Sequence, residues 1–416
     1  LPERHRLPIS RAAAARISFA KQLIDPDSLT EGWKTHGVHS LLDQWARETV
    51  RAIAGELSVP HVRETSWDRN VIVRDTQDVL VPFMIKGFAS DWPAVTRWDP
   101  SSVFRNRCVS PSLSSSCLET SATTSNMFSC HFRCGDLADD SNSDGAEDEV
   151  TVSLSDLFEY FLSQQDDDPL YVFDRKFADA NRCPSMLDDY HNNSGSGPDR
   201  LRAALYPDDL MAHMQTKRPP HRWFLCGPRG SGTAVHRDPP GTLAWNALLK
   251  GCKIWALLDP RMTPHEARCG DEFWHSDLPS ASWFKDYFPE VVKQCPEGMT
   301  VQFAVQCPGD VLVIPPNWWH AVWNVEDTIA VTENGVSLMS FYREVFGRKN
   351  EESIGEASAL VTEVSGGISI AGRLDTEDEE LVKRVEAVFG LEDRAAAAQW
   401  LKQIKMHFSE NPRAPP

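Results

Sequence analysis

Three residues of this sequence have types and spacing that suit a metal ion: His236, Asp238 and His320. One residue separates His236 from Asp238, so on a β-strand both side chains point to the same face. Turn-forming residues stand on both sides of the pair, at 230–233 (GSGT) and 239–242 (PPGT). Neutral imidazoles with a carboxylate suit divalent iron, with zinc or manganese as alternatives. An HxD pair by itself is common, so a third ligand is needed.

His320 is the candidate for that third ligand, although it lies 82 residues after Asp238 (320 − 238). It follows the apolar run 311–316 (VLVIPP), and the end of a buried strand holds a ligand rigidly. The alternative is a core histidine beside Trp318 and Trp319, and the HxD pair makes the metal interpretation stronger. Two histidines and one carboxylate leave coordination positions open, as in the facial triad of non-haem iron oxygenases.

Lys253 stands in an otherwise apolar run, 245–258 (WNALLKGCKIWALL). A buried ammonium needs a partner, because removing it from water unpaired is costly. One interpretation is an internal salt bridge, but no acid stands nearby before Asp259. The other is a binding site for the carboxylate of an anionic cosubstrate. Three neutral hydrogen-bonding residues lie in similar apolar runs, and each alone is more often structural: Thr233, Asn246 and Thr332.

The elements that hold these residues read as short strands. Apolar runs bounded by Asp, Pro and Gly predict strands at 71–73 (VIV), within 79–88 (VLVPFMIKGF), and at 150–153 and 171–174. From Trp223 to about residue 337 the strands follow one another between Gly and Pro turns, without helices at βαβ spacing. This pattern predicts an all-β barrel or a jelly roll.

Helices are predicted at both ends of the chain and at 154–162. Near the beginning, apolar residues at helical spacing define one face: Leu42, Trp45, Thr49, Ile53 and Leu57. Ser40 is the candidate amino-terminal cap. Residues 1–23 are rich in Arg and Ala, which is typical of a transit peptide or of a basic helix packed on the body. At the other end, helices are predicted over 381–389, where Gly390 is a natural stop, and from about Glu392.

We therefore expect three regions in the 416-residue chain. Residues 1–65 form a helical segment, and residues 66–340 form the β domain. Residues 341–416 form a linker and a carboxy-terminal helical region. Two stretches of the β domain, 108–128 and 135–149, are rich in Ser and Thr or in acids and are predicted to be mobile insertions.

Composition narrows the classes of function. The net charge of −18 argues against direct binding of nucleic acid through its phosphates and is compatible with a basic, Lys- or Arg-rich protein partner. Ten cysteines without regular spacing do not predict a disulfide framework, and we expect reduced thiols in the nucleus or the cytoplasm. No apolar run reaches the roughly 18 residues of a membrane-spanning helix. A homo-oligomer is compatible with the sequence.

At these residues the sequence resembles the Jumonji-C family of iron- and 2-oxoglutarate-dependent oxygenases, and within it a lysyl hydroxylase with reported arginine demethylase activity. The likeness is dense at 217–255 and 308–334, which contain all three candidate ligands and Lys253. It is looser at 82–95, 132–136 and 166–174, and it covers roughly residues 65–337.

The resemblance implies a double-stranded β-helix, a cupin-like jelly-roll barrel open at one end. It implies that His236, Asp238 and His320 bind Fe(II) and form the catalytic centre. The 2-oxoglutarate contacts that it implies come from Lys253, which binds the distal carboxylate, and from four assisting residues: Thr233, Asn246, Tyr171 and Thr332. Tyr171 enters only through the resemblance, and its surrounding match is the shortest. Oxygen and 2-oxoglutarate would then be consumed to oxidise a C–H bond of the substrate.

Three functions stay open. The first is hydroxylation of lysine side chains on a basic protein partner. The second is demethylation of N-methyl arginine or lysine, which needs the same hydrogen abstraction. The third is a non-catalytic Jumonji-C binding scaffold, which would be expected to have lost a ligand or the cosubstrate lysine, and neither residue type is missing here.

Overall fold

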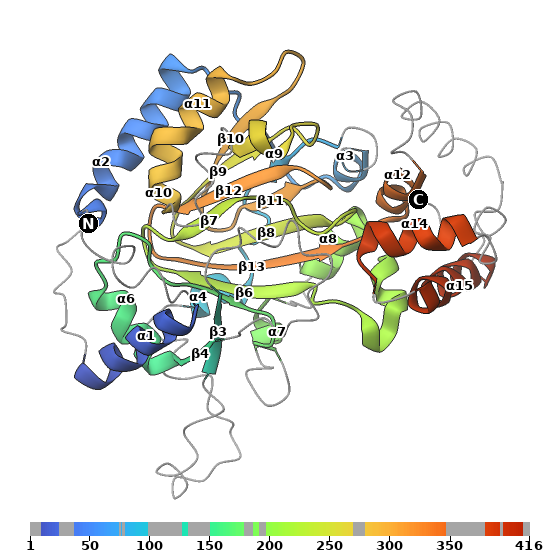
Figure 1. Ribbon diagram of the computed structural model, residues 1–416, viewed down its shortest axis with the longest axis horizontal. Coiled ribbons are helices and arrows are strands. Elements are labelled where there is room, and N and C mark those ends of the chain that lie inside the picture. The colour runs from blue at the N-terminus through green and yellow to red at the C-terminus, as the bar shows by residue number, and fades with distance from the viewer. Residues whose placement is uncertain are drawn as a thin grey trace, which may run out of the picture.

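Two β-sheets form the centre of the protein, with helices on their outer sides and at one end (Figure 1). The computed structural model describes residues 10–24, 37–74, 76, 80–98, 127–131, 150–178, 186–190, 197–268, 279–346, 379–391 and 394–410. The predicted mainly β core with flanking helices is confirmed.

The larger sheet has nine strands and joins segments from most of the chain. In order across the sheet they are β1 (Arg63–Thr65), β2 (Phe83–Ile85), β11 (Val311–Ile314), β8 (Leu243–Lys250), β13 (Thr328–Gly335), β6 (Arg222–Gly227), β5 (Tyr171–Asp174), β3 (Met127–His131) and β4 (Val150–Ser153). Only β1 and β2 pair in parallel, and the other neighbours are antiparallel.

The smaller sheet has four antiparallel strands. They are, in order, β10 (Val301–Gln306), β9 (Lys253–Leu258), β12 (Trp319–Asn324) and β7 (Gly232–His236). Successive side chains of a strand point to opposite faces, so each sheet has an inner and an outer face. Residues from both sheets meet in one buried cluster that includes Ala244, Trp255, Leu257, Leu312 and Val322. The inner faces of the two sheets therefore pack on each other.

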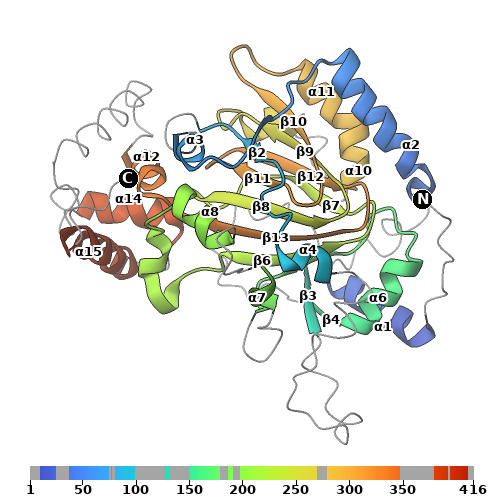
Figure 2. The same ribbon diagram turned by 180° about the vertical axis from the view of Figure 1, so that it is seen from behind.

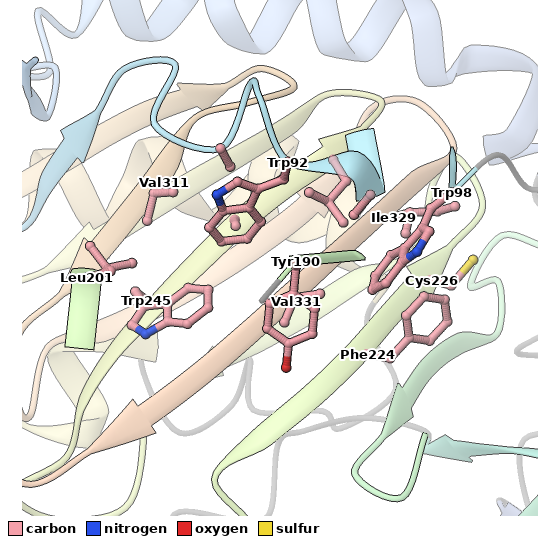
Figure 3. Close-up of a cluster of buried hydrophobic side chains, with 14 of the residues drawn as sticks. Trp92, Trp98, Tyr190, Leu201, Phe224, Cys226, Trp245, Val311, Ile329 and Val331 are labelled. Carbon is pink, nitrogen blue, oxygen red and sulfur yellow. The ribbon is translucent and has the colours of Figure 1, made fainter. Parts of the chain in front are cut away.

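The outer face of the larger sheet carries the aromatic part of the core (Figure 3). Trp92 packs edge-on against Trp245 of β8, and Trp98 packs against Phe224 of β6, with ring centroids 6.2 and 5.7 Å apart. Tyr190 lies between these pairs, 5.9 Å from Trp92. Three short helices lie on this face: α4 (Pro93–Arg97), α7 (Met186–Tyr190) and α8 (Pro198–Leu205). Trp92 and Trp98 flank α4, and Tyr190 is the last residue of α7.

Helices cover the outer face of the smaller sheet (Figure 1). They are α2 (Val38–Arg51), the π-helical segment η1 (Ala52–Glu56), α9 (Pro264–Arg268), α10 (Ser280–Ser282), the π-helical segment η4 (Trp283–Tyr287) and α11 (Phe288–Lys293). The predicted apolar stripe of the first region is confirmed, since Leu42, Thr49 and Ile53 are buried and Trp45 and Leu57 pack on the same cluster.

The predicted cap of that helix is wrong. The helix begins at Val38, so Ser40 lies inside its first turn and donates its hydroxyl to the Gly37 carbonyl. The free amide of Val38 instead donates to the Asp167 carboxylate, 2.9 Å away. A free amide in the first turn of a helix can donate to any suitably placed carboxylate, and here a residue 129 positions away in sequence provides it.

Other predicted elements have mixed outcomes. Residues 71–73 belong to helix α3 (Arg69–Arg74), not to a strand, because a short apolar run does not distinguish a buried helix from a strand. The second run contains β2 as predicted, and 154–162 lies in α6 (Leu154–Ser163). The insertions at 108–128 and 135–149 lie outside the described residues, except that Met127 and Phe128 begin β3. Residues 347–378, where the linker after the β domain is expected, also lie outside them.

The amino-terminal basic segment contains helix α1 (Arg11–Ile24), which lies beside α6 and β4 (Figure 1). Ala13 and Ile17 are buried, and the amide of Ser10 donates to Glu159 of α6 at 2.9 Å. Residues 11–24 thus form a helix packed on the body, one of the two interpretations that the composition left open.

The carboxy-terminal helices form a separate buried cluster beyond one end of the sheets (Figures 1 and 2). The cluster joins the 3-10 helix η3 (Leu210–Lys217), α12 (Leu338–Phe346), α14 (Glu379–Phe389) and α15 (Arg394–Glu410). As predicted, one helix ends before Gly390, whose φ is 58°. Trp400 is at the centre: its indole nitrogen donates to the Leu210 carbonyl at 2.8 Å, and its ring lies 4.9 Å from that of Phe389.

Replacing Trp400 with alanine should destabilise this cluster. A buried tryptophan truncated to alanine costs about 3–5 kcal/mol, through lost burial and the cavity left behind. Urea unfolding should show this loss, whereas Met406→Ala on the same helix should change the free energy of unfolding by less than about 0.5 kcal/mol, because Met406 is 51% exposed. Equal stability of the two variants would show that Trp400 does not hold the cluster together.

Candidate metal and anion site

The three candidate metal ligands lie together at one end of the smaller sheet. His236 is the last residue of β7 and pairs directly with His320 of β12, so both imidazoles are on the same face. Their ring centroids are 4.2 Å apart. Asp238 follows two residues later, and the ligand atoms of the three side chains all lie within 4.8 Å of one another. The structure thus brings together residues that are far apart in sequence.

Hydrogen bonds orient both imidazoles. His236 Nδ1 lies 2.8 Å from the Ala234 carbonyl oxygen, and His320 Nδ1 lies 3.1 Å from that of Trp318. A carbonyl only accepts, so each Nδ1 carries the proton and donates it, which leaves each Nε2 lone pair free. Burial, with His320 adding to it, lowers the pKa of His236 to about 3. His236 is therefore neutral at physiological pH, the form that binds metal.

The spacing between these groups suits one shared ion. Asp238 Oδ1 is 4.0 Å from His320 Nε2, too far for a direct hydrogen bond. Ligand bonds of about 2.0–2.2 Å put two ligand atoms of one ion at most about 4.4 Å apart. The Asp238 side chain is 26% exposed, whereas that of His320 is 5% exposed, so the carboxylate is on the more open side of the cluster.

Lys253 is fully buried between the sheets. Its ammonium donates to the Tyr171 hydroxyl at 2.8 Å and lies 5.8 Å from the ring centre of Trp255. No carboxylate of the described residues comes within 4.0 Å of it, so the salt-bridge interpretation finds no partner there. Burial lowers the pKa of Lys253 to about 7, and the charge of the neighbouring Cys226 offsets only part of the loss of water.

Strand register places Lys253 and the metal ligands on one inner face. In β9, Lys253 pairs with Asn324 of β12, and Leu257 pairs with His320. Residues 253, 255 and 257 of β9 point to the same face. Only one inward-pointing residue of β9 therefore lies between Lys253 and Leu257, the residue opposite His320. That residue is Trp255, whose ring centroid is 6.2 Å from that of His320. An anion bound by Lys253 would therefore extend towards the metal ligands along Trp255.

Several buried polar atoms on this inner face have no hydrogen-bond partner among the residues that the structure describes. They include Thr233 Oγ1, Asn246 Oδ1 and Asn324 Oδ1. An unsatisfied buried polar atom costs roughly 1–3 kcal/mol, so it calls for a ligand or water. Thr332, the other threonine of the predicted set, pairs with Asn246 across the sheet. Unlike the Thr233 hydroxyl, its hydroxyl already has a partner, because it donates to the Trp245 carbonyl at 2.8 Å.

Three polar residues near Lys253 were not predicted from the sequence. Asn324 donates its amide to the Ser231 hydroxyl at 2.9 Å, and Gln306 pairs with Lys253 on its other side. Asn324 could have been found, because it lies four residues after His320 and so on the same face of a strand. Gln306 and Ser231 carry no such local signal. Gly227 is required here, since a Cβ would collide with the Tyr171 ring and with Ser231.

At the metal end, helix α12 connects the two ligand-bearing loops. Glu344 is buried, and it accepts a hydrogen bond from the Asn317 side chain, three residues before His320. A Cβ on Gly241, three residues after Asp238, would lie 3.1 Å from Glu344 and 3.1 Å from Phe389 of α14. The carboxy-terminal cluster therefore packs against the loops that carry Asp238 and His320.

Known proteins are similar to this chain over the stretch that contains the candidate site. The family model "JmjC domain, hydroxylase" matches residues 223–334. The Caenorhabditis elegans "Bifunctional arginine demethylase and lysyl-hydroxylase psr-1" is 31% identical over 79% of this chain and 71% of its own length. Its Caenorhabditis briggsae counterpart is 30% identical over 82% and 74%. The chicken "2-oxoglutarate and iron-dependent oxygenase JMJD4" is 32% identical over 28% and 27%.

In the described part of the chain, no helix has both the length and the apolar character that crossing a membrane requires.

Replacing Lys253 with methionine should stabilise the protein in the absence of ligands. The lysine pKa is about 7 in the fold and about 10.4 when unfolded, so between these values the unfolded chain binds more protons. Stability of the wild type should therefore rise with pH across this window and be lowest at and below pH 7. Methionine fills a similar volume without a charge, and the gain at pH 7 should be on the order of a few kcal/mol.

Thermal unfolding at pH 6 to 10, with metal and cosubstrate removed, measures this effect. The difference between the wild type and Lys253→Met should shrink as the pH rises. A difference that does not change with pH would mean that the lysine is not held uncompensated in the interior.

Proposed function

We propose, from the premise that this chain belongs to the JmjC-domain hydroxylase family, that it hydroxylates lysine side chains of a protein substrate, using Fe(II), 2-oxoglutarate and O2. The observation that carries the proposal is Lys253: a buried ammonium that has no carboxylate partner in the described part of the chain, on the same inner face as a His–Asp–His cluster. An enzyme of this class needs both features, because the iron and the anionic cosubstrate must lie side by side.

The donor set fits iron. His236, Asp238 and His320 offer two neutral imidazole nitrogens and one carboxylate oxygen, the ligands of the facial triad. The cluster includes no cysteine, which would favour zinc or copper. Three protein ligands leave coordination positions for 2-oxoglutarate and O2, and the partly exposed Asp238 lies on the side that a substrate could reach.

The polar groups near Lys253 fit a dicarboxylate. The ammonium and the Tyr171 hydroxyl can both donate to one carboxylate, and the buried Thr233 hydroxyl has no partner among the described residues. The amides of Asn246 and Asn324 each hold a buried oxygen that likewise has no partner there. Turning the Asn246 amide by 180° presents its NH2 group to a carboxylate, whereas Asn324 would have to give up its bond to Ser231 to do so. Thr332 can assist only if its hydroxyl leaves the Trp245 carbonyl.

Bound iron would supply the oxidising chemistry, with 2-oxoglutarate converted to succinate and carbon dioxide. The chain supplies orientation and a dry interior. Lys253 binds the far carboxylate of the cosubstrate, and Trp255 lines the path from there to His320. The Nδ1 hydrogen bonds keep the Nε2 atoms of both histidines directed at the ion.

The two sheets support the finer fold that the resemblance implied, a double-stranded β-helix. Their inner faces pack together around the site. The strands β6, β7, β8 and β9 alternate between the two sheets as the chain proceeds, and so do β10, β11, β12 and β13. We propose that the metal end is the open end, since Asp238 is the most exposed ligand, and that the Lys253 end is closed by Gly227, Ser231 and Asn324.

The substrate is proposed from the relatives and from charge. Two relatives are named as both arginine demethylases and lysyl-hydroxylases, and the net charge of −18 suits a basic protein partner. Demethylation of N-methyl arginine is the second candidate, because the same names include it and because abstraction of hydrogen from an N-methyl carbon needs the same site. A nuclear or cytoplasmic location stays a prediction.

Purified protein with ferrous iron and O2 should convert 2-oxoglutarate to succinate, and Asp238→Ala should lose this activity by at least about a hundredfold, since it removes the one carboxylate ligand. His236→Ala provides a second control. Succinate measured by chromatography that is no higher for the wild type than for both variants would favour the non-catalytic scaffold.

The substrate reaction can be read by mass spectrometry of Lys- and Arg-rich peptides after turnover. Gain of one oxygen on lysine is the result expected for hydroxylation. Loss of a methyl group from a methylated arginine, with formaldehyde released, would overturn the lysyl hydroxylase assignment in favour of demethylation.

Binding of 2-oxoglutarate should weaken as the pH rises above 7. The carboxylate needs the charged form of Lys253, whose pKa is about 7 before binding, so binding above that pH takes up a proton. The dissociation constant should rise by up to about tenfold per pH unit, measured by calorimetry with Fe(II) under anaerobic conditions. Lys253→Met should bind weakly at every pH while retaining iron, and equal loss of iron would mean that Lys253 has a structural role.

A further inference from the structure

Two cysteines face each other at the lysine end of the smaller sheet. Cys252 immediately precedes β9, and Cys307 immediately follows β10. The last paired residues at this end of the two strands are Lys253 and Gln306. Continuing this antiparallel register by one position places Cys252 opposite Cys307. Residues directly opposite in an antiparallel pair carry their side chains on the same face. This face is the outer one, because Lys253 points inward.

Backbone hydrogen bonds show which kind of pair this is. The Cys252 carbonyl accepts from the Val325 amide at 2.9 Å, so the Cys252 backbone faces β12 and not β10. The Cys307 amide donates to Asp310 Oδ2 at 3.0 Å. Cys252 and Cys307 are thus a non-hydrogen-bonded pair, for which Cα atoms are about 4.5 Å apart. Disulfides span Cα separations of about 4.4–6.8 Å, so a bond fits at the short, strained end of the range.

The surroundings differ between the two thiols. Both are free, with Cys307 exposed and Cys252 half-buried. Burial, and then the charge of Cys307, raises the pKa of Cys252 to about 11, which agrees with the proximity that the register requires. Cys307 is therefore the thiol that a soluble oxidant meets first.

We propose that Cys252 and Cys307 form a dithiol site that hydrogen peroxide oxidises to a disulfide across β9 and β10. The Cys307 thiolate attacks one peroxide oxygen, the O–O bond breaks, and hydroxide leaves and is protonated to water, giving a sulfenic acid. The Cys252 sulfur then attacks the Cys307 sulfur. The S–S bond forms, the S–O bond breaks, and the hydroxyl leaves with the Cys252 proton as a second water. Two thiols and one peroxide give one disulfide and two waters.

Such a disulfide would act on the neighbouring Lys253 and Gln306. A bond between Cys252 and Cys307 draws together the ends of the strands that carry these two residues, whose side chains point inward. The backbone at this point is constrained on its other side by the Val325 bond to Cys252, so strain from the bond passes to Lys253. We expect weaker binding of the cosubstrate in the oxidised form. This consequence rests on the proposed 2-oxoglutarate site, whereas the disulfide itself does not.

The disulfide is tested on the full chain treated with hydrogen peroxide, with iron withheld because ferrous iron itself reacts with peroxide. After alkylation of free thiols, chymotrypsin separates Cys307 from Cys295 by cutting after Phe303. The expected product is a linked Cys252–Cys307 peptide pair, two hydrogens lighter than its parts and split by dithiothreitol. Absence of this pair under native conditions would overturn the proposal. Cys295→Ser should leave the link intact, and Cys252→Ser and Cys307→Ser should each abolish it.

The consequence is tested by calorimetry of 2-oxoglutarate with oxidised and reduced protein, after removal of peroxide and addition of Fe(II) without oxygen. Oxidation should raise the dissociation constant at least fivefold in the wild type and in Cys295→Ser, and leave it unchanged in Cys252→Ser. Equal affinity of the two forms would remove the regulatory role. Lack of binding by the reduced protein would instead contradict the proposed function, and the peptide mapping is independent of that result.

Discussion

The pairing of β7 with β12 is the constraint on which the site depends. It places His236 directly opposite His320, although 84 positions separate them in sequence (320 − 236). The same strand β12 pairs on its other side with β9, and this register sets the distance between Lys253 and the histidines. A slip of one residue in either pairing would turn the ligands to the outer face. The register of these strands therefore sets the positions of the candidate site residues relative to one another.

The interior between the sheets is unusual in what it buries. Lys253, Asn246, Asn324 and Thr233 are all nearly inaccessible to solvent, and several of their polar atoms lack a partner in the described part of the protein. These groups cost stability until a ligand satisfies them. The outer faces offset that cost with the aromatic cluster around Trp245 and with the helices over the smaller sheet. The outer faces of the two sheets are thus packed with apolar side chains, whereas the space between the sheets holds these polar groups.

Different parts of the chain contact the two ends of the smaller sheet. At the metal end, α12 and α14 contact the loops after Asp238 and before His320, through Glu344 and Phe389. At the lysine end, the neighbours are a turn and two cysteines on adjacent strands. The carboxy-terminal helical cluster therefore packs at the end of the sheet that carries the candidate metal ligands, and the thiols lie at the end that carries Lys253.

The sequence by itself determined the residue types of the site. The HxD spacing on a strand, the histidine after VLVIPP and the lysine in an apolar run are local patterns that can be read without coordinates. It also indicated the mainly β core and the helical stripe of α2. Tertiary structure decided what local patterns do not contain. It made 71–73 a helix and capped α2 with Asp167 in place of Ser40. Within the described residues it left Lys253 without an acid, and it set Asn324, Gln306 and the two cysteines beside this lysine. The physical reason is that periodicity reports which face a residue takes, whereas the partner across a sheet depends on the register of strands far apart in the chain.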